Sequence, residues 1–300
     1  MKKRFFWVAL GLIGVSWLLN SMYAYSKQLI EPIFLDHYID VSYQDNLYTT
    51  FYYLTNKNDK SVITSMTAGE VMGYPEQPYS FDGSIQNNQS FNNHVLRSVQ
   101  LMFHLDPTSQ TKDYSFTEMD VVFSDGKRIT APIGHVMIQS STIDGSPLEQ
   151  TSSSSSNDNS GQAWYRAIEP LAVETIDSSF KDLLQDDFFI KINTPISPLE
   201  SKSPNAEFLD SIEKEWQDIP GLNVQDVSFP IHLKELDTLS VHSKFPANSK
   251  AVLDVNIYIS GTTESGKAFS TTAGHIVQPY LEQKDVNEII KEKTKGDADG

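Results

Sequence analysis

Alternation of apolar and polar residues with a period of two runs through both halves of the chain, and it constrains the fold more than any other feature. Successive side chains of a β-strand point to opposite faces, so this pattern is typical of strands with one buried and one solvated face. It is clearest at residues 99–105, 119–123, 227–233, 239–245 and 255–259. We therefore expect a mostly β protein built from antiparallel sheets.

Turn residues between these runs agree with this interpretation. Asp125-Gly126 separates two strand-like segments, and Ser265-Gly266 stands in the corresponding place later in the chain. Glycine readily takes the positive φ that tight hairpin turns need. Both pairs therefore predict β-hairpins.

Two collinear matches within the chain predict an internal repeat. Residues 126–136 align without gaps on residues 266–276, and both segments begin with Gly-Lys and later carry Gly-His. Residues 30–36 match residues 168–174 at nearly the same offset. Matches that keep their order and spacing indicate a duplicated domain.

A serine-rich segment divides the chain into flanks of similar size. Residues 144–162 contain almost no apolar side chains and so predict a flexible Ser/Asn-rich linker. On either side we expect an antiparallel β-sandwich domain of immunoglobulin-like type, at residues 27–143 and 163–283. Residues 284–300 would form a charged C-terminal tail, in which Asp285 and Glu288 begin a helix that frays from Lys291 to Gly300.

Helix is expected mainly as a minor insertion in the second domain. Ser203 suits an N-cap and Pro204 the first helical position of a segment that ends near Asp218. Its apolar stripe is Phe208, Leu209, Ile212 and Trp216.

The first 26 residues predict a membrane segment. Three basic residues precede the 21 uncharged residues 5–25. At about 1.5 Å per residue these span roughly 30 Å, the thickness of the hydrocarbon core. The basic flank stays in the cytoplasm, so the C-terminal bulk would be extracytoplasmic on a single-pass anchor in the cell membrane. The alternative is a signal peptide cleaved near Ala24-Tyr25-Ser26, which would make the protein secreted. We favour the anchor.

Charge and cysteine content exclude several classes of function. Residues 27–300 hold 20 of the 23 basic residues and all 39 acidic residues, a formal net charge of −19. Such a surface repels nucleic acid and anionic lipid, so membrane contact is expected only through residues 5–25. Cysteine is absent, which excludes disulfides, thiol nucleophiles and thiolate metal sites.

Recognisable catalytic or metal-binding patterns are lacking. The sequence has no nucleophile elbow, no phosphate-binding glycine loop and no histidine pair at metal-ligand spacing. The repeated Gly-His at His135 and His275 is the only suggestive pair, and we interpret it as a packing feature shared by two strands. We therefore expect no catalytic residues, no bound metal and no cofactor.

One loop has the composition of a recognition surface. Between Gly73 and Gly83 it carries Tyr74, Tyr79 and Phe81 among prolines. Aromatic rings held in this way can bind a sugar ring or an extended peptide. The alternative is that they close one end of a sandwich.

Taken together, these features predict a non-enzymatic binding module of the cell envelope, whose partner is another envelope protein or a wall polymer. The alternative is an extracytoplasmic hydrolase that acts on cell-wall polymers. A deep cleft with convergent ionisable groups would favour the hydrolase.

Overall fold

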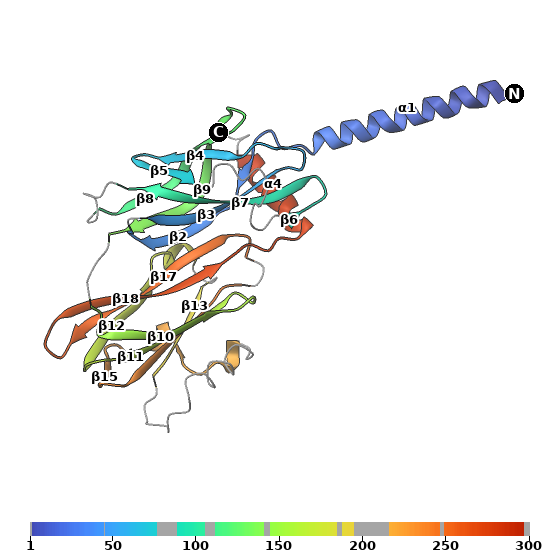
Figure 1. The fold of residues 1–300 in the computed structure, drawn as a ribbon. Coiled ribbons are helices and arrows are strands. Elements are labelled where there is room, and N and C mark those ends of the chain that lie inside the picture. Colours follow the sequence, from blue (N-terminus) through green and yellow to red (C-terminus); the bar gives the residue numbers. More distant parts are fainter. Residues whose placement is uncertain are drawn as a thin grey trace.

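The structure, a computed structural model, describes residues 2–44, 46–76, 89–105, 112–140, 145–184, 188–194, 216–246 and 249–296. These residues are mostly β-strand, with one long helix that projects from the body (Figure 1). The mostly β fold expected from the alternation is confirmed.

The helices and strands follow the chain in two groups. The first group is α1 (Lys2–Ser26), β1 (Ile33–Phe34), β2 (His37–Ser42), β3 (Leu47–Asn56), β4 (Ile63–Ala68), β5 (Val71–Pro75), β6 (Gln89–Ser90), β7 (His94–His104), β8 (Tyr114–Phe123) and β9 (Arg128–Gln139). The second is β10 (Leu148–Ser155), β11 (Ser160–Ala167), β12 (Leu171–Ser178), α2 (Lys181–Leu184), β13 (Phe189–Asn193), η3 (Trp216–Asp218), β14 (Leu222–Asn223), η4 (Val224–Asp226), β15 (Ile231–Leu233), β16 (Thr238–Lys244), β17 (Val252–Thr263), β18 (Ala268–Val277) and α4 (Gln283–Gly296).

The described strands form two sheets. In the larger sheet the hydrogen-bonded order is β1-β3-β7-β5-β4-β8-β9-β2-β17-β12-β15, with β6 also paired to β7 and β18 to β17. In the smaller sheet the order is β10-β11-β16-β13-β14. Among the described strands, pairing is parallel only where β2 meets β9 and β17.

Strand β17 joins the two halves of the chain (Figure 1). One of its edges pairs with β18 along most of its length. The other edge pairs first with β2, through residues 252–254, and then with β12, through residues 257–263. As a result, β2 has a hydrogen-bonded partner on each side.

Buried side chains gather in separate clusters. The largest cluster of the first half draws on strands β1 to β5 and β7 to β9. A second cluster unites β10 to β13 with β15 to β18, and so lies between the two sheets. The predicted alternation decides which side chains enter these clusters: Leu101 and Phe103 on β7 are buried, whereas His104 is exposed.

Both predicted glycine turns form β-hairpins. In β8–β9 the Phe123 amide donates to the Lys127 carbonyl, and the Gly126 amide donates to the Phe123 carbonyl, each over 2.9 Å. In β17–β18 the Thr263 and Gly266 amides make the same two bonds, again over 2.9 Å. The two glycines have φ values of 88° and 81°, the left-handed conformation that ends such a turn.

The expected flexible linker at residues 144–162 is wrong over most of its length. Leu148–Ser155 forms β10 and pairs in antiparallel register with β11, which begins at Ser160. Strand formation here needs few apolar side chains, because β11 supplies backbone partners and β10 lies at the edge of its sheet.

The helix expected to begin near Asp285 is confirmed, but the fraying expected from Lys291 is wrong as far as Gly296. Helix α4 occupies Gln283–Gly296 and buries Val286 and Ile289 against Leu35, Leu54 and neighbouring residues of the first half. Spacing of three places both side chains on one helical face, so packing, not charge, decides the structure.

Two further expectations concern residues 203–233. Of the helix predicted from Pro204 to Asp218, the described part is η3, and residues 201–215 lie outside the described residues. Of the alternating run at 227–233, only Ile231–Leu233 forms a strand. The short helix η4 ends just before that run.

Helix α1 stands apart from the body. Its residues Phe5–Ser26 have a mean hydropathy of 1.6, and none of the side chains described there is buried in the body. This segment is long and apolar enough to span a membrane, a property that it shares with signal sequences.

Candidate functional site

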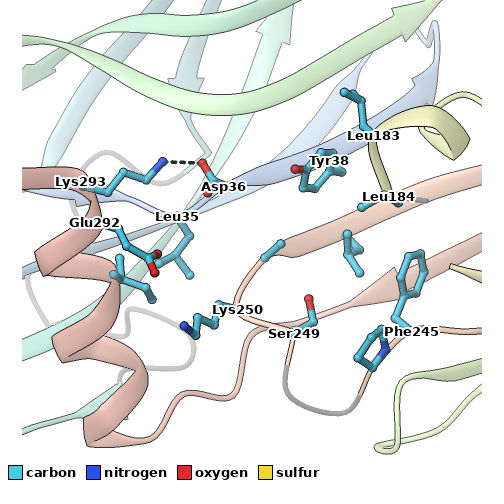
Figure 2. A pocket seen from close by; sticks show the side chains of 14 residues that line it. Leu35, Asp36, Tyr38, Leu183, Leu184, Phe245, Ser249, Lys250, Glu292 and Lys293 are labelled. Carbon is cyan, nitrogen blue, oxygen red and sulfur yellow. Dashed lines mark hydrogen bonds and ion pairs between the residues drawn. The ribbon is translucent and has the colours of Figure 1, made fainter. Parts of the chain in front are cut away.

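A groove lies where β2, β17, α2 and α4 meet (Figure 2). Its cavity volume is about 380 Å³, within the range of small-ligand sites. Figure 2 shows α4 on one side and α2 on the other. The lining residues are Leu35, Asp36, Tyr38, Leu183, Leu184, Phe245, Pro246, Ser249, Lys250, Ala251, Leu253, Ile289, Glu292 and Lys293.

Apolar side chains form the floor of the groove. Leu35, Phe245 and Leu253 are each only 1% exposed, so a ligand would meet their edges. Phe245 stacks on Phe188 with ring centroids 4.3 Å apart and an interplanar angle of 3°. Close packing of this kind leaves the floor little freedom to rearrange.

One wall of the groove carries charge. Lys293 of α4 pairs with Asp36, and Lys250 pairs with Glu288 of α4 over 2.5 Å (Figure 2 shows the first pair). The Lys293 and Lys250 side chains are 27% and 33% exposed. Such partly exposed pairs add little stability, but they hold α4 beside β2 and leave charged groups at the rim.

A buried carboxylate lies on the same strand as the groove residue Tyr38. Asp40 of β2 is 1% exposed and accepts hydrogen bonds from Ser179 (2.7 Å), Gln139 (3.0 Å) and Tyr258 (2.8 and 2.9 Å). Burial raises the pKa of the Asp40 carboxyl, while these donors lower it.

A second carboxyl couples to the first. Burial, followed by the charge of Asp40, raises the pKa of Asp254 to about 6. Asn256 donates from its side chain to the Asp40 carbonyl over 2.8 Å. Because the donors come from β9, β17 and the segment before α2, this network fastens β2 to the second half of the chain.

The predicted aromatic surface is placed only in part. Tyr74 lies on β5 and is 41% exposed, and its ring packs edge-on against His104 at 5.6 Å. Its hydroxyl donates to the Met72 sulfur over 2.5 Å. Tyr79 and Phe81 lie outside the described residues, so a surface made by all three stays a prediction.

The two histidines of the repeated Gly-His pair have different surroundings. His135 is half-buried and stacks on Tyr38 with centroids 5.9 Å apart. His275 is 2% exposed, and its Nδ1 lies 2.6 Å from the Ser243 hydroxyl. Burial lowers the pKa of His275 to about 4. Within the described residues, no three His, Asp or Glu side chains are grouped so that they could hold a metal ion.

The sequence does not predict which residues line the groove. They come from four segments that are far apart in the chain, around residues 35–38, 183–184, 245–253 and 289–293. None of these segments carries a local motif. The spacing of Val286 and Ile289, within the helix expected to begin near Asp285, is a pattern that could have indicated packing of that helix on the first half of the chain.

Comparisons of the sequence with known proteins assign this chain to no family. No protein-family model matches this chain, and no curated protein is similar to it in sequence.

Proposed function

We propose that this chain is a single-pass protein of the cell membrane whose extracytoplasmic body binds a segment of another envelope protein in the groove between α2 and α4. The observation that carries this proposal is the lining of the groove, which combines an apolar floor with a charged rim. The body would consist of two immunoglobulin-like β-sandwich domains that arose by duplication.

The proposed location depends on α1. The helix is uncharged and apolar from Phe5, it follows a basic flank, and none of its described side chains is buried in the body. A helix with these properties needs a lipid environment or removal by a signal peptidase. The second case would release the same body as a secreted protein.

The proposed tandem sandwiches depend on the core clusters and the hairpins. The core of the second half lies between strands of the two sheets, as in a sandwich. The hairpins β8–β9 and β17–β18 turn with the same hydrogen bonds at positions that match in sequence. We place the division between the two domains before β10.

The chemistry of the groove favours a protein ligand over a wall polymer. A sugar ring needs an exposed aromatic face and several hydrogen-bonding groups, whereas the floor residues Phe245 and Leu253 are almost fully buried. A polyanionic polymer would be repelled by a body with a net charge of −19. An apolar side chain from a peptide segment, with charged neighbours to meet Lys250 and Lys293, suits the lining best.

A hydrolase is the second candidate, and the coupled carboxyls Asp40 and Asp254 are the observation that favours it. Yet the Asp40 oxygens already accept hydrogen bonds from Ser179, Gln139 and Tyr258. A carboxylate used in this way is a structural acceptor, so we rank hydrolysis below binding.

Photo-crosslinking tests the proposal. Leu183 is 51% exposed at the groove, and Leu222 is 58% exposed on β14, so a benzophenone amino acid at either position leaves the core intact. In native membranes we expect a discrete adduct from position 183 and none from position 222. The adduct should be lost when Lys250→Glu and Lys293→Glu are added. Equal labelling from both positions, or no adduct at 183, would contradict the proposal.

A further inference from the structure

The segment between α1 and the body is held by the body itself. Asn56, at the end of β3, makes two reciprocal hydrogen bonds with the backbone of Leu29: the Leu29 amide donates to Oδ1 over 2.9 Å, and Nδ2 donates to the Leu29 carbonyl over 2.8 Å. A side-chain amide that pairs with a backbone in this way fixes the position of that residue as a strand partner would.

Two more side chains hold the same segment. His94 Nε2 donates to the Lys27 carbonyl over 2.9 Å. Lys127 Nζ donates to the Ile30 carbonyl over 2.7 Å and lies 3.5 Å from the Glu31 carboxylate. Residues 27–31 are therefore bonded to β3, β7 and the β8–β9 turn, and the anchor meets the body without a free tether.

This attachment limits the distance between the body and the membrane. From Ser26, the end of the apolar helix, to Leu29 the chain can extend at most about 10 Å. The headgroup layer of a bilayer is roughly 5–8 Å thick on each side. Asn56 and His94 must then lie within or just outside the headgroups when Phe5–Ser26 spans the membrane.

The surface around this attachment has side chains that suit an interface. We name it the juxtamembrane rim, and it consists of residues 27–31, 56–60, 91–94 and 280–284. Backbone and side-chain bonds connect its parts: Lys57 donates from its amide to the Asn93 carbonyl, and the Asn92 amide donates to the Gln283 side chain.

Exposed apolar and basic groups are present on the juxtamembrane rim. Ile30 is 92% exposed and Tyr280 is 83% exposed, although both are large apolar side chains. Lys27, Lys57, Lys60 and Lys284 are also exposed there, beside the exposed carboxylates of Glu31 and Glu282. Tyrosine and lysine are favoured at the membrane–water interface, where rings enter the headgroup layer and ammonium groups meet phosphates.

We propose that the juxtamembrane rim rests on the phospholipid headgroups and thereby gives the body one fixed orientation on the membrane. The inference rests on the anchored form of the proposed function. The net charge of −19 argues against adsorption of the body as a whole. In the rim, however, four lysines outnumber the three carboxylates of Glu31, Asp59 and Glu282, and exposed apolar groups lie at the one end that α1 holds near lipid. The ligand groove opens beside α4, whose first turn belongs to this rim.

Single-cysteine labelling tests this orientation cleanly, because the chain has no cysteine of its own. Full-length protein in nanodiscs would carry a fluorophore at Asn58→Cys, at Tyr280→Cys or at Ser265→Cys, and the lipids would carry a headgroup-linked quencher. Ser265 lies in the β17–β18 turn, about 35 Å along β17 from the end that pairs with β2, and Figure 1 shows that turn far from α1. We expect severalfold stronger quenching at 58 and 280 than at 265.

The attachment is tested by loosening it. Asn56→Ala together with His94→Ala should reduce the quenching at 58 towards the value at 265. Equal quenching at all three positions, or no effect of the double substitution, would overturn the proposal. The intact mass of the protein isolated from membranes distinguishes a failure of the proposed orientation from a failure of the proposed ligand binding. A mass lacking residues 1–26 would overturn the fixed orientation, whereas crosslinking in the groove would be unaffected.

Discussion

The hairpins β8–β9 and β17–β18 begin alike and end differently. Their turns share two hydrogen bonds and a glycine of positive φ. Further along, β9 gains β2 as a parallel neighbour, whereas β17 is the described partner of β18. Segments that match in sequence thus form the same turn. The surroundings of the matched Gly-His pair differ, however, because β9 and β18 have different neighbouring strands.

The glycine of that pair shows the difference most clearly. Gly134 has a φ of 90°, and a Cβ there would lie 2.4 Å from the His37 carbonyl oxygen and 2.5 Å from its amide nitrogen. At Gly274 the nearest atom to such a Cβ is Asn256 Oδ1, at an ordinary 3.8 Å. Only the first position requires glycine, because β2 approaches it closely.

Gly134→Ala should therefore have the largest effect. The left-handed backbone and the contact with β2 should together cost about 4 kcal/mol or more, or prevent folding. Gly274→Ala is the matched control and should change stability by less than about 0.5 kcal/mol. Urea unfolding followed by tryptophan fluorescence measures both, and similar losses at the two positions would contradict the comparison.

Substitutions of the two histidines of the Gly-His pairs should show the next largest difference in stability. His275→Ala removes a fully packed ring and leaves the Ser243 hydroxyl without its 2.6 Å partner, so we expect a loss of about 3 kcal/mol. His135→Ala removes a half-buried ring that stacks on Tyr38, for which we expect less than about 1 kcal/mol. The same unfolding measurement decides, and a larger loss at His135 would reverse the interpretation.

Acid should weaken the fold through buried histidines. Burial lowers the pKa of His37, His242 and His275 to about 4 from an ordinary value of 6.5. Between these values the unfolded chain binds protons that the folded chain does not, so the free energy of unfolding falls as pH decreases from 6.5 to 4, by up to about 3 kcal/mol per histidine.

Asp254 acts in the opposite direction over part of the same range. Its pKa is raised from 3.8 to about 6, so between these values the folded chain holds a proton that the unfolded chain has released. The free energy of unfolding therefore falls through this group as pH rises from 3.8 to about 6. The three histidines together should contribute more to the pH dependence of the free energy of unfolding than this one carboxyl. Unfolding curves at pH 7.5, 5.5 and 4.5 test the balance, and His275→Gln should flatten the pH dependence. An unchanged dependence in that variant would argue against His275 as a contributor.

Substitutions in the two hairpin turns should have the smallest effect on stability, and their two effects should be nearly equal. Gly126→Ala and Gly266→Ala each force alanine into a left-handed turn with open space around the new methyl group. We expect each to cost about 1 kcal/mol. Unfolding midpoints measured side by side should agree, and a clear inequality would show that the two turns are not equivalent.

Strands with a solvated face could be predicted from the sequence, because burial on one side imposes the alternation directly. Leu101 and Phe103 of β7 illustrate this, as do Ile257 and Ile259 of β17. Strand β10 could not be predicted, since its pairing with β11 uses backbone groups and needs no apolar side chain beyond Leu148.

The groove could not be predicted for a different reason. Its lining joins Tyr38 of β2, Phe245 beyond β16 and Ile289 of α4, and the parallel pairing of β2 with β17 is one of the long-range contacts that bring these segments together. Parallel pairing leaves no mark in the sequence comparable to a hairpin turn. The buried Asp40 is likewise indistinguishable in the sequence from the many solvated carboxylates of this acidic chain.

The placement of β2 has a mechanical consequence. If α1 anchors the protein as proposed, a pull on the body away from the bilayer would enter the fold through residues 27–36 and reach β2, which is held by parallel ladders to β9 and to β17. Tension along a strand loads such ladders in shear, so their hydrogen bonds must break together instead of opening one at a time. In the anchored form proposed above, β2 would therefore bear load close to the point where the chain enters the fold.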